Sequence, residues 1–306
     1  MKKFLINFWR VVSHSSSDGI RLFVVCRFFM LQFLFRLKKP ASIKFLDKNI
    51  TFDFKKTGST STYYHGLNEP HDMMFLGKLL NSKFSFIDVG ANIGIYTLLS
   101  SITGVKKTIA LEPDLANFKE LKSNTNKWGC NNVDILNYAV GDNEGYVLLH
   151  GDDVAAHITD FSEENLNNNR VKCIRLDQLI PDIKGSKVVL KIDTEGYEHE
   201  ILLGSEELFQ LDQVHSVLVE INTNNIKTGA SSSIITFLSN LGYKPCRYDI
   251  EKEKLILVDG YNKEQDNTIF IKNENFIEFN NYDHTSEVLG LLKKQRKKIF
   301  NFTYSQ

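Results

Sequence analysis

The chain has 306 residues, of which 42% are hydrophobic, so it is long enough for one large domain with appendages and has enough apolar side chains to fill a core. Lys and Arg together number 37, as do Asp and Glu, and this balance excludes an overall field that would favour nucleic acid or a membrane. The four cysteines are scattered without a C-x-x-C pair, which argues against a zinc site or a redox motif and fits a reducing cytoplasm.

Residues 1–42 form a basic, aromatic N-terminal extension. Its most apolar stretch, residues 20–37, is interrupted by three arginines, so it contains no run of about 18 uncharged residues that would predict a transmembrane helix. Two interpretations stay open. Residues 1–40 form an amphipathic element that rests peripherally on a membrane face or on a partner, or they form a helix that packs on the main domain.

Residues 43–82 are predicted to form a hairpin, a loop and a helix that cover the site. Apolar stretches at 43–45 and 50–54 flank the sequence LDKN, which is typical of a hairpin. Residues 56–72 are polar and rich in turn-forming residues, so we expect a loop there, followed by a short helix over 73–80.

The core, residues 83–273, alternates apolar strands with helices. This alternation predicts a mostly parallel sheet covered by helices on both faces. An insertion at 143–175 interrupts the pattern, and the last strands are predicted to form an antiparallel hairpin at one edge. The tail, 274–306, has weak periodicity and is predicted to be a solvated helix. The expected strands are 84–89, 107–111, 133–136, 187–192, 214–221, 243–248, 254–258 and 268–271, with two short strands at 145–149 and 171–174 in the insertion. The expected helices are 93–102, 115–128, 197–209 and 231–241.

The stretch FSFIDVGANIGIY, residues 84–96, carries the strongest functional signal. Apolar residues end in Asp88, and Gly90, Asn92 and Gly94 follow before an apolar stretch resumes. The pattern predicts a buried strand, a tight turn and the first turn of a helix. Glycine lets a ligand approach the main chain, and the free N–H groups of a helix start attract polar groups, so we expect a nucleotide-like cofactor here.

Glu112 follows Gly90 by 112 − 90 = 22 residues and ends the next strand, where a carboxylate can accept hydrogen bonds from two ribose hydroxyls. The glycine pattern is G-A-N-I-G, not the G-x-G-x-x-G of dinucleotide folds. Asp88 beside it would repel a pyrophosphate but attract the ammonium group of a sulfonium amino acid. The pattern therefore favours S-adenosylmethionine over a nicotinamide cofactor.

Several segments resemble, in order, those of one known family: DVGANIGIYTLL, ALEPDLANFKELKSNT, NYAVGDNEG, VVLKIDTEGYEHEILLG and VLVEIN. Together with the later QDNTIFIK they are similar to the FkbM family of S-adenosylmethionine-dependent methyltransferases, over about residues 43–273. The resemblance implies a Rossmann-like class I methyltransferase, an α/β fold whose mostly parallel seven-stranded sheet has an antiparallel edge strand and helices on both faces. It also implies methyl transfer to oxygen, often on sugars or polyketide-like products.

The resemblance assigns roles by position. The methionine part of the cofactor would be held by Asp88, Gly90, Asn92 and Gly94. Glu112 would hold the ribose, and the adenine would be flanked by Ala139, Val140 and Asp142. The transferred methyl group would face Asp193 and Glu195.

A hydroxyl acceptor needs a group that removes its proton as the new bond forms. The catalytic candidates are acids at the ends of two late strands: Asp193, Glu195 and Glu220. His199 is a rival base. Asp193, Glu220 and Asn222 also offer the oxygen ligands that a divalent cation such as Mg²⁺ prefers, but a metal-free acid cluster is favoured.

The leading hypothesis is an S-adenosylmethionine-dependent O-methyltransferase that acts on a hydroxyl of a sugar, a glycan or another small molecule, in bacterial glycan biosynthesis. Two alternatives stay open: a non-catalytic protein that binds the cofactor, and a nicotinamide-dependent oxidoreductase. We expect acceptor specificity in the loops at 56–72 and 151–170. We also expect no nucleic-acid partner and a cytoplasmic location, peripheral at the inner membrane face if residues 1–40 contact lipid. The oligomeric state is open.

Overall fold

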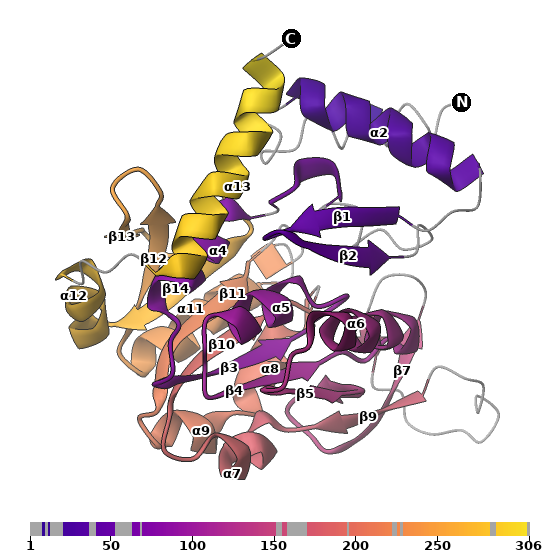
Figure 1. Ribbon diagram of the computed structural model, residues 1–306. Coiled ribbons are helices and arrows are strands. Elements are labelled where there is room, and N and C mark those ends of the chain that lie inside the picture. Colours follow the sequence, from indigo (N-terminus) through magenta and orange to yellow (C-terminus); the bar gives the residue numbers. More distant parts are fainter. Residues whose placement is uncertain are drawn as a thin grey trace.

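A computed structural model of the chain places a central sheet between two layers of helices, with a smaller sheet at one side and an N-terminal layer above (Figure 1). Among the described residues, no helix combines the length and the hydropathy needed to cross a bilayer. The structure describes residues 8–9, 12, 21–36, 41–52, 63–67, 69–150, 155–157, 170–194, 196–221, 225–226, 229–281 and 286–304.

The central sheet confirms the predicted α/β class, with strands in the order β13-β12-β14-β11-β10-β3-β4-β5. The strands from β5 to β11 are parallel, and β14 is antiparallel to β11. β12 and β13 form an antiparallel hairpin at the edge. The described part of the chain therefore gives this sheet eight strands instead of the expected seven, because β13 pairs with the outer side of β12. The bounds are β3 (Phe84–Val89), β4 (Lys107–Leu111), β5 (Val133–Leu136), β10 (Lys187–Ile192), β11 (Val214–Glu220), β12 (Tyr243–Asp249), β13 (Lys254–Leu257) and β14 (Asn267–Lys272).

Hydrophobic cores lie on both faces of this sheet, because successive side chains of a strand point to opposite sides. In β3, Phe86 belongs to the core under α4 and α5, whereas Ile87 belongs to the core under α7, α8, α9 and α11. Helices on both faces confirm the predicted layering. The bounds are α4 (Pro70–Leu79), α5 (Ile95–Ile102), α6 (Leu115–Trp128), the 3₁₀ turn η3 (Leu176–Leu179), α7 (Ile180–Ile183), α8 (Glu198–Leu203), α9 (Glu206–Gln210) and α11 (Ala230–Asn240).

The single helix expected over 197–209 is wrong, because the helix is divided at Gly204 into α8 and α9. Gly204 lies against the chain at Gly141, and a Cβ on Gly204 would be 2.0 Å from the Gly141 carbonyl oxygen. A continuous helix with a larger residue at this position could not approach that segment.

The insertion forms a second sheet of order β6-β9-β7-β8 beside the central one. β6 (Tyr138–Val140) pairs in parallel with β9 (Arg170–Ile174). β7 (Gly145–His150) is antiparallel to β9 and to β8 (Ala155–His157). Most of the 151–170 loop, for which we predicted a role in acceptor specificity, lies outside the described residues.

The N-terminal layer consists of helix α2 (Arg21–Arg36) and the hairpin of β1 (Ala41–Phe45) and β2 (Lys48–Phe52). The hairpin packs on the end of α6, where the rings of Phe45 and Trp128 stack with centroids 6.0 Å apart. Residues 56–62 and 68 of the predicted 56–72 loop lie outside the described residues, and α4 begins at Pro70, before the predicted end of the loop.

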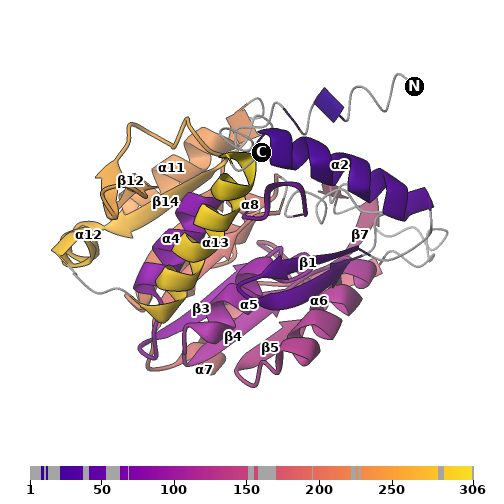
Figure 2. The same cartoon turned by 45° about the horizontal axis from the view of Figure 1, so that its top comes forward.

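The C-terminal segment forms α12 (Asn273–Asn281) and α13 (Glu287–Tyr304), and the latter lies along α4 (Figure 2). The expectation of a solvated helix is wrong for α13, since Leu289 and Leu292 are buried. Gly77 of α4 permits the close contact, because a Cβ at Gly77 would lie 2.8 Å from Leu292.

Candidate functional site

The carboxyl ends of β3, β4 and β10 meet at the glycine turn. The backbone N–H groups of Gly90 and Ala91 both donate to the carbonyl of Leu111, which ties the turn to β4. Gly90 has a φ of 79°, and a Cβ there would lie 1.9 Å from the carbonyl oxygen of Asp193 at the end of β10. Only glycine, which has no Cβ, fits at this position. The turn after β3 therefore contacts the ends of both neighbouring strands, β4 and β10.

Glu112 fixes the glycine turn by accepting hydrogen bonds from backbone N–H groups. Its Oε2 accepts the N–H of Asn92 at 2.7 Å, and its Oε1 accepts the N–H of Asp114 at 2.9 Å. Burial raises the pKa of Glu112 to about 7, while the N–H groups of Asp114 and Asn92 oppose that rise. One carboxylate therefore orders both the turn after β3 and the start of α6.

Asp88, the last polar residue before the turn, is completely buried. Its Oδ2 accepts a hydrogen bond from the Thr97 hydroxyl at 2.6 Å, and its Oδ1 has no hydrogen-bond partner among the described residues. Burial raises its pKa, and the positive charge of Lys191 works against that rise. A buried acceptor without a partner is unfavourable, so this oxygen is suited to a group that enters the site.

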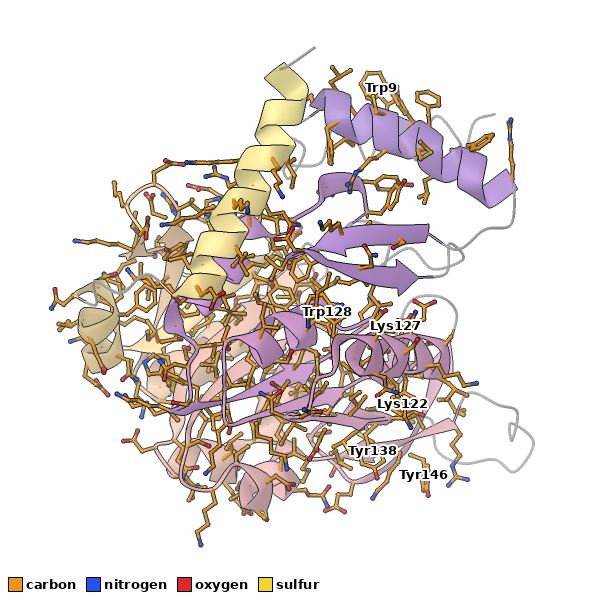
Figure 3. The ribbon with its side chains drawn as sticks, viewed as in Figure 1. Trp9, Lys122, Lys127, Trp128, Tyr138 and Tyr146 are labelled. Carbon is orange, nitrogen blue, oxygen red and sulfur yellow. The ribbon has the colours of Figure 1, made fainter. Side chains whose placement is uncertain are left out.

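A small pocket opens between the glycine turn and the second sheet. Among the residues assigned to the cofactor, it brings together Gly90, Ala139 and Val140. Asp142 lies beyond it, and its carbonyl accepts from Arg175 at 3.0 Å. Tyr138, the first residue of β6, belongs to the second sheet and also lines the pocket (Figure 3). The pocket is lined by Val89, Gly90, Leu111, Pro113, Tyr138, Ala139, Val140, Thr194 and Tyr197.

Asn92 and Gly94 shape the turn without lining this pocket. Asn92 adopts a left-handed conformation with a φ of 52°, and its Oδ1 accepts the N–H of Ile93. Gly94 is the N-cap of α5 and packs against Leu121 of α6. Both residues therefore place the start of α5 beside the site.

Asp193 ends β10 and pairs with a buried lysine. The Nζ of Lys191 lies 2.7 Å from Asp193 Oδ2 and 4.7 Å from the centre of the Tyr96 ring. Burial disfavours the charge on Lys191, but the carboxylates of Asp193, Asp88 and Glu69 outweigh burial and raise its pKa. The lysine is therefore a fixed positive charge among acids.

Glu69 joins this group from the start of α4. Its Oε2 accepts the hydroxyl hydrogen of Tyr96 at 2.5 Å. Burial and the charge of Asp193 raise the pKa of Glu69 to about 7. Asp72, one turn further along α4, accepts from Asn267 at 3.0 Å, and burial and the charge of Glu69 raise its pKa too.

Sequence reasoning missed these residues. Lys191 did carry a signal, because a charged residue in the middle of a buried apolar strand needs a partner. Glu69 and Asp72 lie in a segment that was interpreted as a loop, and nothing in their spacing predicts that α4 brings them to the end of β10.

Glu195 and Asn222 lie outside the described residues. Glu220 ends β11, opposite Asn267 of β14. No group of three or more His, Cys, Asp or Glu that could hold a metal ion occurs within the part of the chain that the structure describes.

Glu198, which the sequence analysis passed over, orders the loop after β10. It is completely buried, and its Oε1 accepts the N–H groups of Thr194 and Gly196, both at 3.0 Å. Its Oε2 accepts from Asn225 at 2.6 Å. The rival base His199, the next residue on α8, is half-buried.

Solved structures with similar folds share little sequence with this chain. M. jannaschii TYW2 in complex with AdoMet is 12% identical, with a TM-score of 0.38 over 76% of this chain and 84% of that chain. SMU.1697c from Streptococcus mutans in complex with SAH is 10% identical, with a TM-score of 0.40 over 67% of this chain and 99% of that chain. An rRNA methylase from Streptococcus thermophilus is 10% identical, with a TM-score of 0.38 over 67% and 98%. No curated protein sequence matches the chain.

The comparison with protein-family models shows to which family the chain belongs. The model of the methyltransferase FkbM domain matches residues 88–245, which is 245 − 88 + 1 = 158 of the 306 residues. The matched range contains the glycine turn, Glu112, the pocket and the Lys191–Asp193 pair. The chain therefore belongs to the FkbM family of methyltransferases, which use S-adenosylmethionine as the methyl donor.

Proposed function

We propose that this methyltransferase acts on oxygen, transferring the methyl group to a hydroxyl of a sugar, a glycan or another small molecule. The observation that carries this proposal is a pair of carboxylates near the glycine turn: Asp193, which follows β10, and Glu69, at the start of α4, which feels the charge of Asp193. An oxygen acceptor needs a base, and a protein that only bound the cofactor would have no use for these acids. Family membership speaks against the nicotinamide-dependent alternative.

The residues of the site fit S-adenosylmethionine. The pocket beside Gly90 has apolar walls from Val89, Leu111 and Val140, which suit a flat purine. The carboxylate oxygens of Glu112 each accept one N–H and keep lone pairs for ribose hydroxyls. The unpartnered Oδ1 of Asp88 suits the ammonium group, directly or through a water molecule.

When bound, the donor supplies a methyl group on a positively charged sulfur that leaves as a neutral thioether, so no acid is needed. The protein then has two tasks, which are to align the acceptor and to take its proton. In our proposal Glu69 takes the proton, since a general base is most effective when its pKa lies near the working pH. Tyr96 holds the Glu69 carboxylate in place, and Asp193, fixed by Lys191, orients the acceptor hydroxyl.

We infer that the reaction does not depend on a divalent cation. The ammonium group of Lys191 already provides the positive charge next to Asp193, and it would repel a metal ion at that carboxylate. Turnover that survives treatment with EDTA would agree with this inference, and turnover restored only by Mg²⁺ would contradict it.

The test is an assay with isotope-labelled S-adenosylmethionine and a panel of hydroxyl acceptors, read by mass spectrometry of the products. Glu69→Gln and Asp193→Asn are expected to retain cofactor affinity in calorimetry and to lose about 10²-fold or more of turnover. His199→Gln, on α8 at the other face of the sheet, is the control and should keep its activity. Methyl transfer to nitrogen or carbon acceptors alone, or full turnover in both acid variants, would overturn the proposal. The proposal also includes a sugar or glycan as the acceptor, a role in bacterial glycan biosynthesis and a cytoplasmic location.

A further inference from the structure

Helix α2 is apolar on two opposite sides. Its inner side packs into the domain, where Phe23, Val24, Phe28 and Leu31 are buried. Its outer side exposes large apolar residues at helical spacing: Leu22 (46%), Phe29 (54%), Met30 (54%) and Phe33 (58%). The structure thus combines the two interpretations left open by the sequence, since the helix packs on the domain and also presents an apolar surface outward.

We propose that this outer face of α2 (Leu22, Phe29, Met30 and Phe33) is a docking surface for an anionic lipid bilayer. Single exposed apolar residues are ordinary, but a contiguous group marks an interaction site. The other large exposed apolar residues of the described chain lie one by one on separate elements, such as Leu211 and Leu257. Trp9, 65% exposed, lies over the same helix (Figure 3), and a Trp is typical of the lipid interface.

Positive charge surrounds the outer face of α2, although the chain as a whole is neutral. α2 contains no acidic residue, and Arg21 and Arg36 are exposed at its two ends. On α13, which contacts α2, Lys294 and Lys297 are exposed. The negative potential of an anionic lipid surface attracts nearby basic residues, so the charge complements such a surface.

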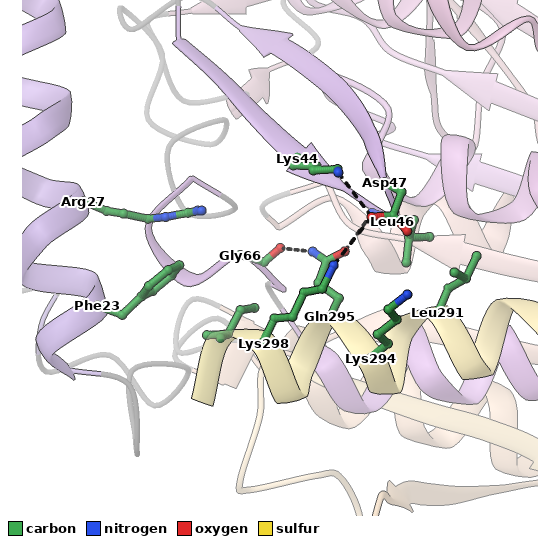
Figure 4. A pocket seen from close by; sticks show the side chains of 11 residues that line it. Phe23, Arg27, Lys44, Leu46, Asp47, Gly66, Leu291, Lys294, Gln295 and Lys298 are labelled. Carbon is green, nitrogen blue, oxygen red and sulfur yellow. Dashed lines mark hydrogen bonds and ion pairs between the residues drawn. The ribbon is translucent and has the colours of Figure 1, made fainter. Parts of the chain in front are cut away.

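A pocket between α2, the β1–β2 turn and α13 adds to this charge (Figure 4). Arg27, Lys44, Lys294 and Lys298 line it, with Asp47 as the one acid among its lining residues. Phe23 and Arg27 reach into it from α2, facing the lysines of α13. The pocket is therefore a cationic recess beside the apolar face, of the kind that suits a lipid phosphate.

The charges favour a bilayer over a second copy of this chain. In a two-fold dimer through α2, each copy would bring the same basic helices to the interface, and like charges would repel. The geometry also favours a helix that lies in the plane of the interface. Arg27, which also lines the pocket, donates to the carbonyl of Tyr63 at 2.5 Å, and this bond fixes α2 along the surface of the domain.

A short segment connects the inner side of α2 to the candidate active site. The Tyr64 ring lies 5.9 Å from the ring of Phe28 on α2, and Glu69, five residues later, bonds to Tyr96. Lipid docking would therefore hold the bilayer near the acceptor side of the site, which suits an acceptor attached to a lipid. This link to the acceptor rests on the proposed function, whereas the docking itself does not.

The test is sedimentation of the full chain with phosphatidylcholine vesicles, with and without phosphatidylglycerol. We expect binding to the anionic vesicles and at least tenfold weaker binding in the double variant Phe29→Ser, Phe33→Ser. The matched control is Leu211→Ser, Leu257→Ser, which removes two exposed apolar side chains elsewhere and should bind as the wild type does. Lys294→Gln with Lys297→Gln should weaken binding to anionic vesicles and reduce its dependence on salt.

A second measurement uses the unchanged chain. Brominated lipids in anionic vesicles should quench the fluorescence of the exposed Trp9 and spare the buried Trp128. The absence of binding to anionic vesicles, or unaltered binding in the Phe29 and Phe33 variant, would overturn the proposal. A dimer in solution that the same variant converts to a monomer would assign the face to self-association instead. Calorimetry with S-adenosylmethionine on every variant keeps these outcomes separate from the fate of the proposed function.

Discussion

The Nζ of Lys191 lies 2.7 Å from Asp193 Oδ2, although the side chain of Lys191 is only 2% exposed and that of Asp193 is 28% exposed. The two residues are two positions apart at the end of β10, and side chains at that spacing point to the same face of a strand. A strand that ends in K-x-D can thus neutralise its own carboxylate while it points both groups toward Glu69 and Asp88. The lysine thereby keeps several acids together in a small volume.

Replacing Lys191 by Met should destabilise the fold, because it leaves buried carboxylates without their positive charge. We expect a loss of about 2–3 kcal/mol in the free energy of unfolding, less than for a fully buried pair because Asp193 is partly exposed. Urea denaturation measures it. Lys187→Met, at the exposed start of the same strand, is the control and should change stability by no more than about 0.5 kcal/mol. Adding Asp193→Asn to Lys191→Met should recover part of the loss, and strict additivity of the two changes would show that the pair is not coupled.

The pH dependence of turnover should report Glu69. With a pKa of about 7, this group is protonated below neutrality and cannot accept a proton, so kcat should rise as the pH increases through about 7. The hydrogen bond from Tyr96 lowers that pKa, so Tyr96→Phe should move the rising limb to higher pH. Glu69→Gln should remove the limb together with most of the activity. A limb that keeps its position in Tyr96→Phe would argue against Glu69 as the base.

The parts of the fold that were predicted correctly are those with local causes. The bounds of β3, β4, β5 and β10 agree with the prediction, because each is a short apolar run between polar or turn-forming residues. Helix α6 agrees too. The side chain of Asp114 caps its first turn by accepting from Ala116 and Asn117, and Gly129 ends it in a left-handed conformation.

The errors arise from contacts between segments that are distant in the sequence. At the break between α8 and α9, Gly204 lies against Gly141, and the burial of α13 depends on Gly77, which admits Leu292. Glu69 reaches the site only because α4 lies across the sheet, which no local pattern encodes. In the candidate site, listing the polar residues at strand ends predicted Asp88, Glu112 and Asp193. It did not predict Lys191 and Glu69, which interact with Asp88 and Asp193 electrostatically.

Glu112 should make stability depend on pH. Its pKa is about 7 in the folded protein and has an ordinary value of 4.5, so the folded state binds the proton more tightly than the unfolded state. The free energy of unfolding should therefore fall as the pH rises from about 4.5 to about 7, by at most about 3 kcal/mol from this group. The slope of the free energy of unfolding against pH should be shallower in Glu112→Gln and unchanged in the surface variant Glu278→Gln.

Glu112→Ala should also abolish binding of S-adenosylmethionine, as measured by calorimetry.

Gly90 should be the least replaceable glycine of the site. In Gly90→Ala the new Cβ would lie 1.9 Å from the carbonyl oxygen of Asp193, so the ends of β3 and β10 would have to separate. The matched control is Gly104→Ala, because Gly104 has a similar φ of 76° against 79° but no atom within 4 Å of the added Cβ. Backbone strain alone should then cost about 1–2 kcal/mol in Gly104→Ala, and that variant should bind S-adenosylmethionine normally. Gly90→Ala should lose more than about 3 kcal/mol in urea denaturation and should also lose cofactor affinity, because the pocket wall and the Asp193 backbone move with it. If the two variants were equally stable, the close approach of Gly90 to Asp193 could not be what holds the turn against β10.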